Sequence, residues 1–348
     1  MRGMPKPVRV EPSRDTVMRT AMSRPRSTRT GWLSAVLIAV TAPAASPAAA
    51  QSAPVMVKLP TGSELATWML APDKPSHKTP VIFLHGGPGM YTTEGAKAKG
   101  AAFRAAGFTT IYFDQAGGGK SKAIPAAGYT IERAIADVEA LRAALGHERV
   151  ILWGNSYGAG LATLYASRFP ARTAGVILTS PGFYPGTRPK RDYSVTNRDK
   201  VKMGKELSAA IRQIDSKGAA AEASLPQSKV NPLFDALVND DLMGGMVCKG
   251  ANLKPPPPGT GGNVYGNRLI DKSLDALKFK PAGQLKVPAL VVRGSCDFLP
   301  LSNAERLAAL FGTTVVTIPS SGHGLVENPA ALEAAFTAFA RGILAGVD

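Results

Sequence analysis

The hydrophobic pattern of the chain alternates between short apolar runs and longer amphipathic segments. The short runs have the length of buried strands: Val55–Leu59, Leu65–Leu70, Val81–Leu84, Thr109–Phe113, Val150–Trp153, Val176–Leu178, Ala289–Val292 and Thr314–Ile318. Between them, apolar residues recur at helical spacing over Ala96–Ala106, Ile131–Leu145 (with Thr130 as its cap), Leu161–Ala166, Asn303–Phe311 and Pro329–Leu344. This alternation predicts an α/β fold with a mostly parallel, doubly wound sheet, opened by a hairpin around Thr61-Gly62.

The alternation stops between Pro181 and Pro288, where no run reads as a buried strand. One amphipathic helix is predicted to end at Gly218, with the apolar residues Val201, Leu207, Ile211 and Ile214. A second is predicted to start at Asn231-Pro232, with Leu233, Phe234, Leu237 and Val238 as its face. We therefore expect a helical lid, residues 181–288, inserted after the sixth strand between two parts of the core, residues 51–180 and 289–348.

The first fifty residues have the order of a secretory signal peptide. A basic segment, residues 1–30, precedes an apolar run over Trp32–Ala42, and Ala48-Ala49-Ala50 supplies small residues before Gln51. The run is shorter than the roughly 20 residues that cross a bilayer, so no stable membrane span is expected after cleavage. We expect an exported chain, periplasmic or secreted; the alternative is a disordered basic tail on a cytoplasmic protein.

The positive charge of the chain is unevenly distributed. The 348 residues carry a formal net charge of +16, and the first 30 hold eight basic and two acidic residues. A second concentration, ten basic against five acidic residues, lies between Arg188 and Lys229. Such a surface can steer anionic partners, but a solvated helix face accounts for it more simply. No nucleic-acid-binding motif accompanies it, so we expect no nucleic-acid partner.

A Gly-x-Ser-x-Gly motif, Gly154–Gly158, follows the run Val150–Trp153 and precedes a helix. Strand, tight turn and helix are the context in which this motif presents a nucleophilic serine. Ser156 is therefore the predicted nucleophile, and the backbone N–H of Tyr157 at the helix N-terminus is a predicted oxyanion donor. The alternative, a chance glycine-serine loop, does not account for the flanking strand and helix.

A serine nucleophile needs a base and an acid that orients the base. Of the four histidines, three lie in a loop, a glycine-rich turn or among surface charges (His77, His85 and His147), whereas His323 directly follows the last predicted strand. Asp297 follows the strand Ala289–Val292. Ser156, Asp297 and His323 then occur in the chain order expected for this architecture. The N–H of Gly87, after the third strand, is the predicted second oxyanion donor.

The chain resembles the α/β hydrolases and, more narrowly, the proline iminopeptidase group of serine exopeptidases. The resemblance rests on the loop His85–Gly89, which reads His-Gly-Gly-Pro-Gly, and on the loop Asp114–Ser121. It covers the core and not the lid, which sets substrate choice in such enzymes. Two departures stand out: Ala116 replaces an arginine of the group, and the elbow reads Gly-Asn-Ser-Tyr-Gly instead of Gly-Gly-Ser-Trp-Gly.

The resemblance implies a serine hydrolase that cleaves an amide or ester of a small molecule or short peptide through an acyl-enzyme. A proline iminopeptidase-like aminopeptidase is the first interpretation, and an esterase or lactonase of the same fold is the alternative. A binding protein without catalysis would be expected to lack the nucleophile, base or oxyanion glycines.

Asp114 is expected to cap backbone N–H groups of its glycine-rich loop.

An aminopeptidase must pair the α-ammonium of its substrate with a carboxylate, because an unpaired buried ammonium is costly. Glu206 in the first lid helix and Asp240 and Asp241 at the end of the second are the candidates. We expect no cofactor and no metal, because the sequence has no phosphate-binding loop and no cluster with metal-ligand spacing. The oligomeric state stays open.

The mature chain contains only two cysteines, Cys248 in the lid and Cys296 beside Asp297. Because an exported chain enters an oxidising compartment, we predict that they form a disulfide. The alternative is a pair of buried, unpaired thiols, since the sequence does not give the distance between them.

Overall fold

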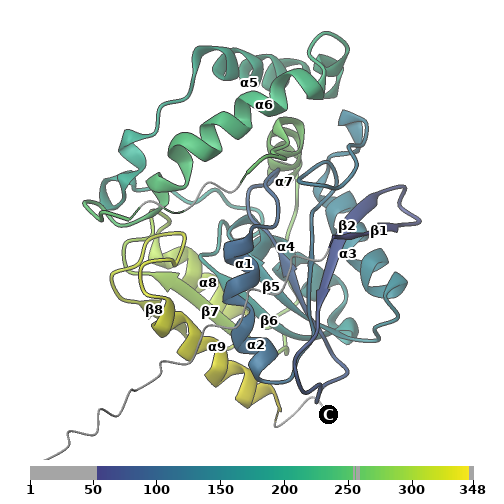
Figure 1. Cartoon of the computed structure of the whole chain (residues 1–348), viewed down its shortest axis with the longest axis vertical. Helices are drawn as coiled ribbons and strands as arrows, with labels where there is room; N and C mark the ends of the chain where they lie inside the picture. Colours follow the sequence, from purple (N-terminus) through teal and green to yellow (C-terminus); the bar gives the residue numbers. More distant parts are fainter. Residues whose placement is uncertain (1–52, 254, 256–258, 345–348) are drawn as a thin grey trace, which may run out of the picture. The chain divides into compact units, whose positions relative to one another are not determined.

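An eight-stranded sheet is the central element of the structure, a computed structural model of the chain (Figure 1). The structure describes residues 53–253, 255 and 259–344, without the side chains of residues 240, 241, 343 and 344. These residues belong to one compact unit, Gln51–Asp348. The predicted signal peptide, residues 1–50, lies outside the described residues.

The strands follow the order β1-β2-β4-β3-β5-β6-β7-β8 across the sheet. Their bounds are Val55–Lys58, Glu64–Leu70, Val81–Leu84, Thr110–Phe113, Val150–Asn155, Thr173–Thr179, Ala289–Gly294 and Val315–Ile318 for β1 to β8. The pairs β1/β2 and β2/β4 are antiparallel, and every other neighbouring pair is parallel. The predicted fold class, a mostly parallel doubly wound sheet opened by a hairpin, is confirmed.

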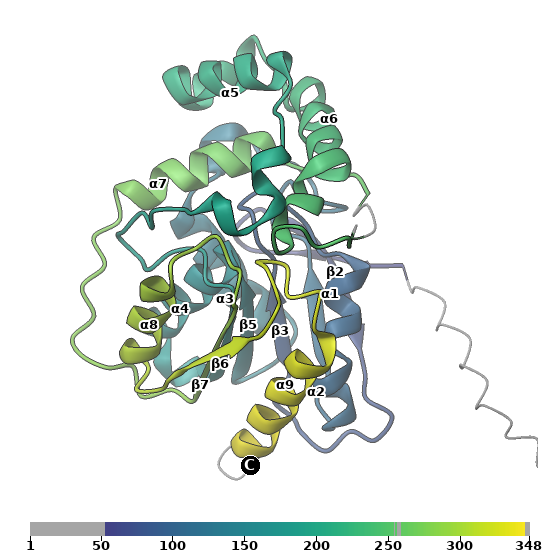
Figure 2. The ribbon, with the colours of Figure 1, turned by 90° about the vertical axis from the view of Figure 1, so that its left-hand side faces the viewer.

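Helices cover both faces of the sheet because side chains of a strand point alternately to opposite faces. In β5, Val150 and Leu152 join the core under α3 (Ile131–Ala144), α4 (Tyr157–Arg168) and α8 (Leu301–Leu310). Ile151 and Trp153 join the core under α1 (Glu94–Lys99), α2 (Ala101–Ala105) and α9 (Pro329–Leu344). Figure 2 shows the two helical layers on opposite sides of the sheet, with α9 beside α2.

The segment between β6 and β7 contains helices and no strand among its described residues. Its α-helices are α5 (Lys205–Lys217), α6 (Gln227–Leu237) and α7 (Asp271–Asp275), and Figure 1 shows α5 and α6 side by side. We call residues 181–288 the lid. Helix α5 ends at the predicted position, where Gly218 adopts a φ of 60°. In the described part of the chain, no helix is long and apolar enough to cross a membrane.

Three predictions about helices are wrong. The first lid helix begins at Lys205, so Val201, which was predicted to lie on its apolar face, precedes it. The helix predicted over Ala96–Ala106 is divided into α1 and α2 at Gly100, against which the Tyr112 hydroxyl packs so closely that a Cβ would collide with it. The second lid helix begins at Gln227 instead of Asn231 and contains Pro232 in its interior. Val230 and Phe234, one turn apart and both buried, extend its apolar face toward the N-terminus.

Candidate active site

Ser156 occupies a sharp turn between β5 and α4. Its φ of 53° is in the left-handed region, which side chains other than glycine rarely adopt. A Cβ on Gly154 would collide with the carbonyl of Gly158, and a Cβ on Gly158 would collide with the carbonyl of Leu84 on the neighbouring strand. Both glycines of the motif are therefore required for the strand, the turn and the helix to approach one another.

The structure brings Ser156, His323 and Asp297 into one hydrogen-bonded row. His323 Nε2 lies 3.0 Å from Ser156 Oγ, and His323 Nδ1 lies 2.9 Å from Asp297 Oδ1. Asp297 and His323 are 5% and 3% exposed, so water has little access to the contact between them. The three residues come from the ends of β5, β7 and β8, which lie at the same edge of the sheet.

The surroundings of Asp297 favour its ionised form. Burial alone would raise the pKa of its carboxyl, but the charge and hydrogen bond of His323, the Leu299 N–H and the charge of Arg293 together lower that pKa. The Leu299 N–H donates to Asp297 Oδ1 over 3.0 Å. On the other side, the Phe298 ring packs against the His323 ring with centroids 4.4 Å apart. The imidazole is therefore fixed in position by a carboxylate and an aromatic ring.

The loop His85–Gly89 lies directly beside the nucleophile. A Cβ on Gly86 would lie 3.1 Å from Ser156 Cβ, and Gly87 adopts a φ of 122°. His85 holds this loop in place through two hydrogen bonds. Its Nε2 accepts from the Gln115 N–H at 2.9 Å. The proton of the neutral ring is therefore on Nδ1, which donates to the Gly86 carbonyl at 3.0 Å. Burial lowers the pKa of His85 to about 4, so this histidine is a neutral structural residue at pH 7.

The backbone N–H of Tyr157 lies at the N-terminus of α4, where the first N–H groups of a helix have no acceptor within the helix. Tyr157 and Gly87 line the same cavity as Ser156. Both residues predicted as oxyanion donors therefore face the cavity into which Ser156 opens.

Asp114 caps the neighbouring glycine-rich loop, as predicted from the sequence. Its two carboxyl oxygens accept from the N–H groups of Thr92 and Lys120, each at 2.8 Å. Burial raises the pKa of Asp114 to about 6 against the opposing effect of these hydrogen bonds. The residue is therefore part of the frame that positions the loop.

A cavity of about 840 Å³ opens above Ser156, and we call it the active-site cavity. Core and lid both line it, with Gly87, Ser156 and His323 from the core and Ile211, Phe234 and Leu242 among the apolar residues of the lid. Its volume is within the range of pockets that enclose small-molecule ligands. Within the described residues, no group of three or more histidine, cysteine or acidic side chains is arranged to hold a metal ion.

Among the described side chains, the carboxylates of the active-site cavity do not include the predicted Glu206. Glu206 is exposed and does not line the cavity, and the side chains of Asp240 and Asp241 lie outside the described part of the structure. The lining carboxylates are Glu94, Asp271 and Asp275, and each is engaged in an ion pair. Their spacing of four residues puts the two aspartates on one helix face, but no signal in the sequence places that face at the cavity.

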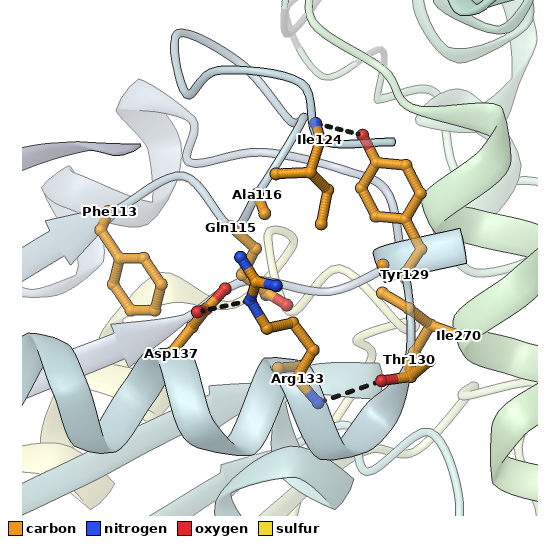
Figure 3. Close-up of a pocket in the computed structure, with 11 residues that line it drawn as sticks. Phe113, Gln115, Ala116, Ile124, Tyr129, Thr130, Arg133, Asp137 and Ile270 are labelled. Atoms are coloured by element: carbon orange, nitrogen blue, oxygen red, sulfur yellow. Dashed lines mark hydrogen bonds and ion pairs between the residues drawn. The ribbon is translucent and has the colours of Figure 1, made fainter. Parts of the chain in front are cut away.

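Ala116, where the proline iminopeptidase group has arginine, does not line the active-site cavity. It faces a separate small pocket of about 20 Å³, shown in Figure 3 together with Phe113, Tyr129 and Ile270. Arg133 from α3 reaches this pocket and pairs with Asp137 over 3.1 Å (Figure 3). Ala116 therefore contributes to this small pocket and not to the active-site cavity.

A disulfide joins Cys248 of the lid to Cys296 of the loop that carries Asp297. The residues around it are hydrogen-bonded to the loop of His323. The Cys248 N–H donates to Glu327 Oε1 at 2.8 Å, and Glu327 also accepts from the Gly322 N–H at 2.9 Å. The Cys296 N–H donates to the Ser321 carbonyl at 2.9 Å. The disulfide thus ties the lid to the loop of the predicted acid, and hydrogen bonds tie both to the loop of the predicted base.

The fold and the site together define the class of the protein. Residues 79–329, most of the chain, match the family described as alpha/beta hydrolase fold, and the chain belongs to that family. The predicted resemblance to this family is confirmed.

Within the family, the chain is similar to proline iminopeptidases. It is 32% identical to the proline iminopeptidase of Thermoplasma volcanium over 105 residues, which are 30% of this chain and 35% of that protein. The chain thus spans about a third of the length of the curated relatives that it matches.

Solved structures share the fold over a larger part of the chain. A proline iminopeptidase-related protein from Thermus thermophilus is 22% identical with a TM-score of 0.55, covering 84% of this chain and 99% of that one. An esterase from Exiguobacterium antarcticum is 18% identical with a TM-score of 0.53, covering 83% and 99%.

Proposed function

We propose that this α/β hydrolase is a serine hydrolase that cleaves an amide or ester bond through an acyl-enzyme. The observation that carries the proposal is the row of hydrogen bonds from Asp297 through His323 to Ser156. His323 Nε2 takes the proton of Ser156 Oγ as that oxygen attacks the carbonyl carbon. Asp297 holds the imidazole in the required tautomer and stabilises the imidazolium that forms.

The N–H groups of Gly87 and Tyr157 are the proposed donors to the oxyanion of the tetrahedral intermediate. His323 then gives its proton to the leaving nitrogen or oxygen, which departs and leaves the acyl group on Ser156. A water molecule, deprotonated by the same histidine, attacks the acyl-enzyme and releases the acid. The scheme is supported by the position of its residues: Ser156, His323, Gly87 and Tyr157 line the active-site cavity, and Asp297 is hydrogen-bonded to His323.

The first candidate substrate class is that of an aminopeptidase similar to the proline iminopeptidases. It is supported by the likeness to such enzymes over about a hundred residues and by the loop His85–Gly89. It requires a carboxylate that accepts the α-ammonium of the substrate.

The second candidate is a carboxylic-ester hydrolase or lactonase, and one observation favours it. Each described carboxylate that lines the active-site cavity already has a basic partner: Glu94 has Lys97, and Asp271 and Asp275 share Arg188. A substrate ammonium bound at any of these carboxylates would therefore lie close to the cation that already pairs with it, and the repulsion would weaken its binding.

Covalent labelling tests the nucleophile. A fluorophosphonate should label the mature protein once, and Ser156→Ala should abolish the labelling. Ser302→Ala, at an exposed position of α8, is the control and should be labelled like the wild type. Labelling of Ser156→Ala would refute the assignment, and an unlabelled wild type would favour a non-catalytic binding protein.

Paired substrates separate the two candidate classes. An aminopeptidase should hydrolyse prolyl-4-nitroanilide at least about 10²-fold faster, in kcat/KM, than its N-acetyl derivative, because acetylation removes a charge-assisted contact. Equal rates on the two anilides, together with turnover of short acyl esters, would support the esterase instead.

We also propose that the protein is exported, to the periplasm or the medium. The support is the order of basic, apolar and small residues before Gln51. N-terminal sequencing of the protein recovered outside the cytoplasm should give a start near Gln51, and an uncleaved protein confined to the cytoplasm would contradict export.

A further inference from the structure

The basic side chains of the active-site cavity outnumber the acidic ones. Five line it: Lys99, Arg188, Arg191, Arg198 and Arg268. Three have evident partners. Arg188 pairs with Asp271 and Asp275, each at 2.6 Å, Arg268 pairs with Asp215 at 2.8 Å, and Lys99 Nζ donates to the Gly324 carbonyl at 2.6 Å.

Arg191 and Arg198 remain without a carboxylate partner among the described side chains. The Arg198 guanidinium lies over the Tyr193 ring, 5.6 Å from its centroid, and its Nη1 is buried without a hydrogen-bond partner. Arg191 Nη1 donates to the hydroxyl of the same tyrosine over 3.3 Å. A buried charged donor without an acceptor is costly, so a partner supplied by a ligand would remove the cost.

This cluster lies near the proposed base. The Tyr193 ring packs on the Phe298 ring with centroids 5.2 Å apart, and Phe298 packs in turn on His323. Two aromatic rings thus separate the arginines from the imidazole, and all these residues line the active-site cavity. A ligand held by the arginines can therefore extend to Ser156 within one cavity.

The backbone that carries the cluster is held in place. Thr196 pairs with Cys248 in an isolated antiparallel bridge, and the Asn197 N–H donates to the Val247 carbonyl at 3.2 Å. Arg198 packs its Cα against Gly245, where an added Cβ would lie 3.2 Å away. The guanidinium groups are therefore presented from a fixed segment, tied through the disulfide to the loop of Asp297.

We propose that Arg191 and Arg198, with Tyr193 between them, bind a carboxylate of the substrate while its scissile carbonyl lies at Ser156. The inference rests on the proposed serine hydrolase and specifies its substrate class: an amide or ester that carries a second, negatively charged end. The planar guanidinium matches a carboxylate with two parallel hydrogen bonds. The carboxylate belongs either to the leaving group, as in a short peptide with a free C-terminus, or to the far end of a dicarboxylic acyl group.

Two matched substrate pairs test the proposal and distinguish a carboxylate on the leaving group from a carboxylate on the acyl group. Prolylglycine against prolylglycinamide varies the leaving group, and mono-4-nitrophenyl glutarate against its carboxamide varies the acyl group. In at least one pair the wild type should prefer the carboxylate by about 10-fold or more in kcat/KM, which is the effect of one charge-assisted hydrogen bond. Arg198→Gln should bring this ratio close to one, and Arg198→Lys should restore part of it.

Lys200→Gln is the matched control, because it removes one positive charge from the same segment at an exposed position outside the cavity. It should leave the ratio unchanged. If Arg198→Gln does not fold, as judged by its thermal transition, Arg191→Gln at an exposed position provides the second variant. A ratio near one in both pairs for the wild type, with Ser156 still labelled by fluorophosphonate, would overturn the inference and leave the proposed function standing.

Binding provides a measurement that does not depend on turnover. Calorimetric titration of Ser156→Ala with the same pairs should give at least about 10-fold tighter binding of the carboxylate member, and Arg198→Gln should remove the difference. Equal affinity of the charged and neutral members would overturn the inference even if no substrate were hydrolysed.

Discussion

Removing the disulfide should weaken both the fold and the site. The change is the double substitution Cys248→Ser and Cys296→Ser, which leaves no single reactive thiol. The bond closes a loop with a sequence separation of 48 residues. In the chain-entropy treatment, closing a loop of this length raises the free energy of the unfolded chain by about 4 kcal/mol, so removing the bond should lower the free energy of unfolding by that amount. For a chain of this size, such a loss of stability corresponds to a decrease of about 6 °C in Tm.

The effect on activity should precede unfolding. The bond joins the lid segment of Cys248, which contacts Glu327 beside His323, to the loop of Asp297. Without it, the positions of base and acid relative to the lid are less restricted, so kcat/KM should decrease at temperatures where the variant is fully folded. We expect a loss of about 10-fold, because small displacements of catalytic groups are costly.

Urea unfolding, the thermal transition and kcat/KM at 25 °C measure these effects. Reduced wild type should behave like the double serine variant, and the variant itself should be insensitive to dithiothreitol, which controls for other effects of the reductant. Two free thiols titrated in the denatured, non-reduced mature protein would refute the bond. A stability loss below about 1 kcal/mol would refute the loop-closure reasoning.

Three further predictions concern single residues of the site. Asp297→Asn should lower kcat by on the order of 10⁴ with the fold retained, because the amide favours the wrong tautomer of His323; a loss below tenfold would contradict the proposed role. Gly87→Ala should lower kcat by about 10²–10³, because the new Cβ would lie 2.7 Å from a backbone nitrogen and displace the oxyanion donor. Gly146→Ala also has a positive φ but meets open space, so it should keep kcat, and equal losses in the two variants would exclude the oxyanion explanation. Finally, burial lowers the pKa of His85 to about 4, whereas a histidine in the unfolded chain has a pKa of about 6.5. The unfolded chain therefore binds the proton first, and the free energy of unfolding decreases as the pH falls from about 6.5 to about 4. His85→Gln should reduce the loss of unfolding free energy between pH 7 and pH 5 by about 2 kcal/mol, as measured by urea unfolding, and an unchanged pH slope would contradict the buried neutral imidazole.

The elements that position the site could be predicted from the sequence because each depends on local pattern. The strands before Ser156 and Asp297 are short apolar runs, and the turn between β5 and α4 follows from two glycines flanking one serine. The close approach of the Tyr112 hydroxyl to Gly100 could not be predicted, since Tyr112 belongs to the strand β4. Local spacing does not contain such tertiary contacts.

In the lid, the sequence also did not indicate which basic side chains face solvent and which face the cavity. We interpreted the basic segment Arg188–Lys229 as a solvated helix face, and the exposed Lys205 and Lys217 of α5 agree with that interpretation. Arg188 and Arg198 of the same segment line the active-site cavity instead. The orientation of these arginine side chains could not be inferred, because the residues before α5 have no helical or strand periodicity that assigns side chains to a face.

The distribution of charge in the cavity bears directly on the choice between the two candidate substrates. A substrate ammonium at Asp271 or Asp275 would lie close to the guanidinium of Arg188, which pairs with both carboxylates and would repel it. The guanidinium of Arg198, in contrast, has a buried donor without an acceptor. Electrostatic complementarity therefore favours an anionic end of the substrate near His323 and disfavours an ammonium there. For an aminopeptidase, this orientation places the free amine on the acyl side of the scissile bond, away from the arginines, and the carboxyl end of a short peptide beside them.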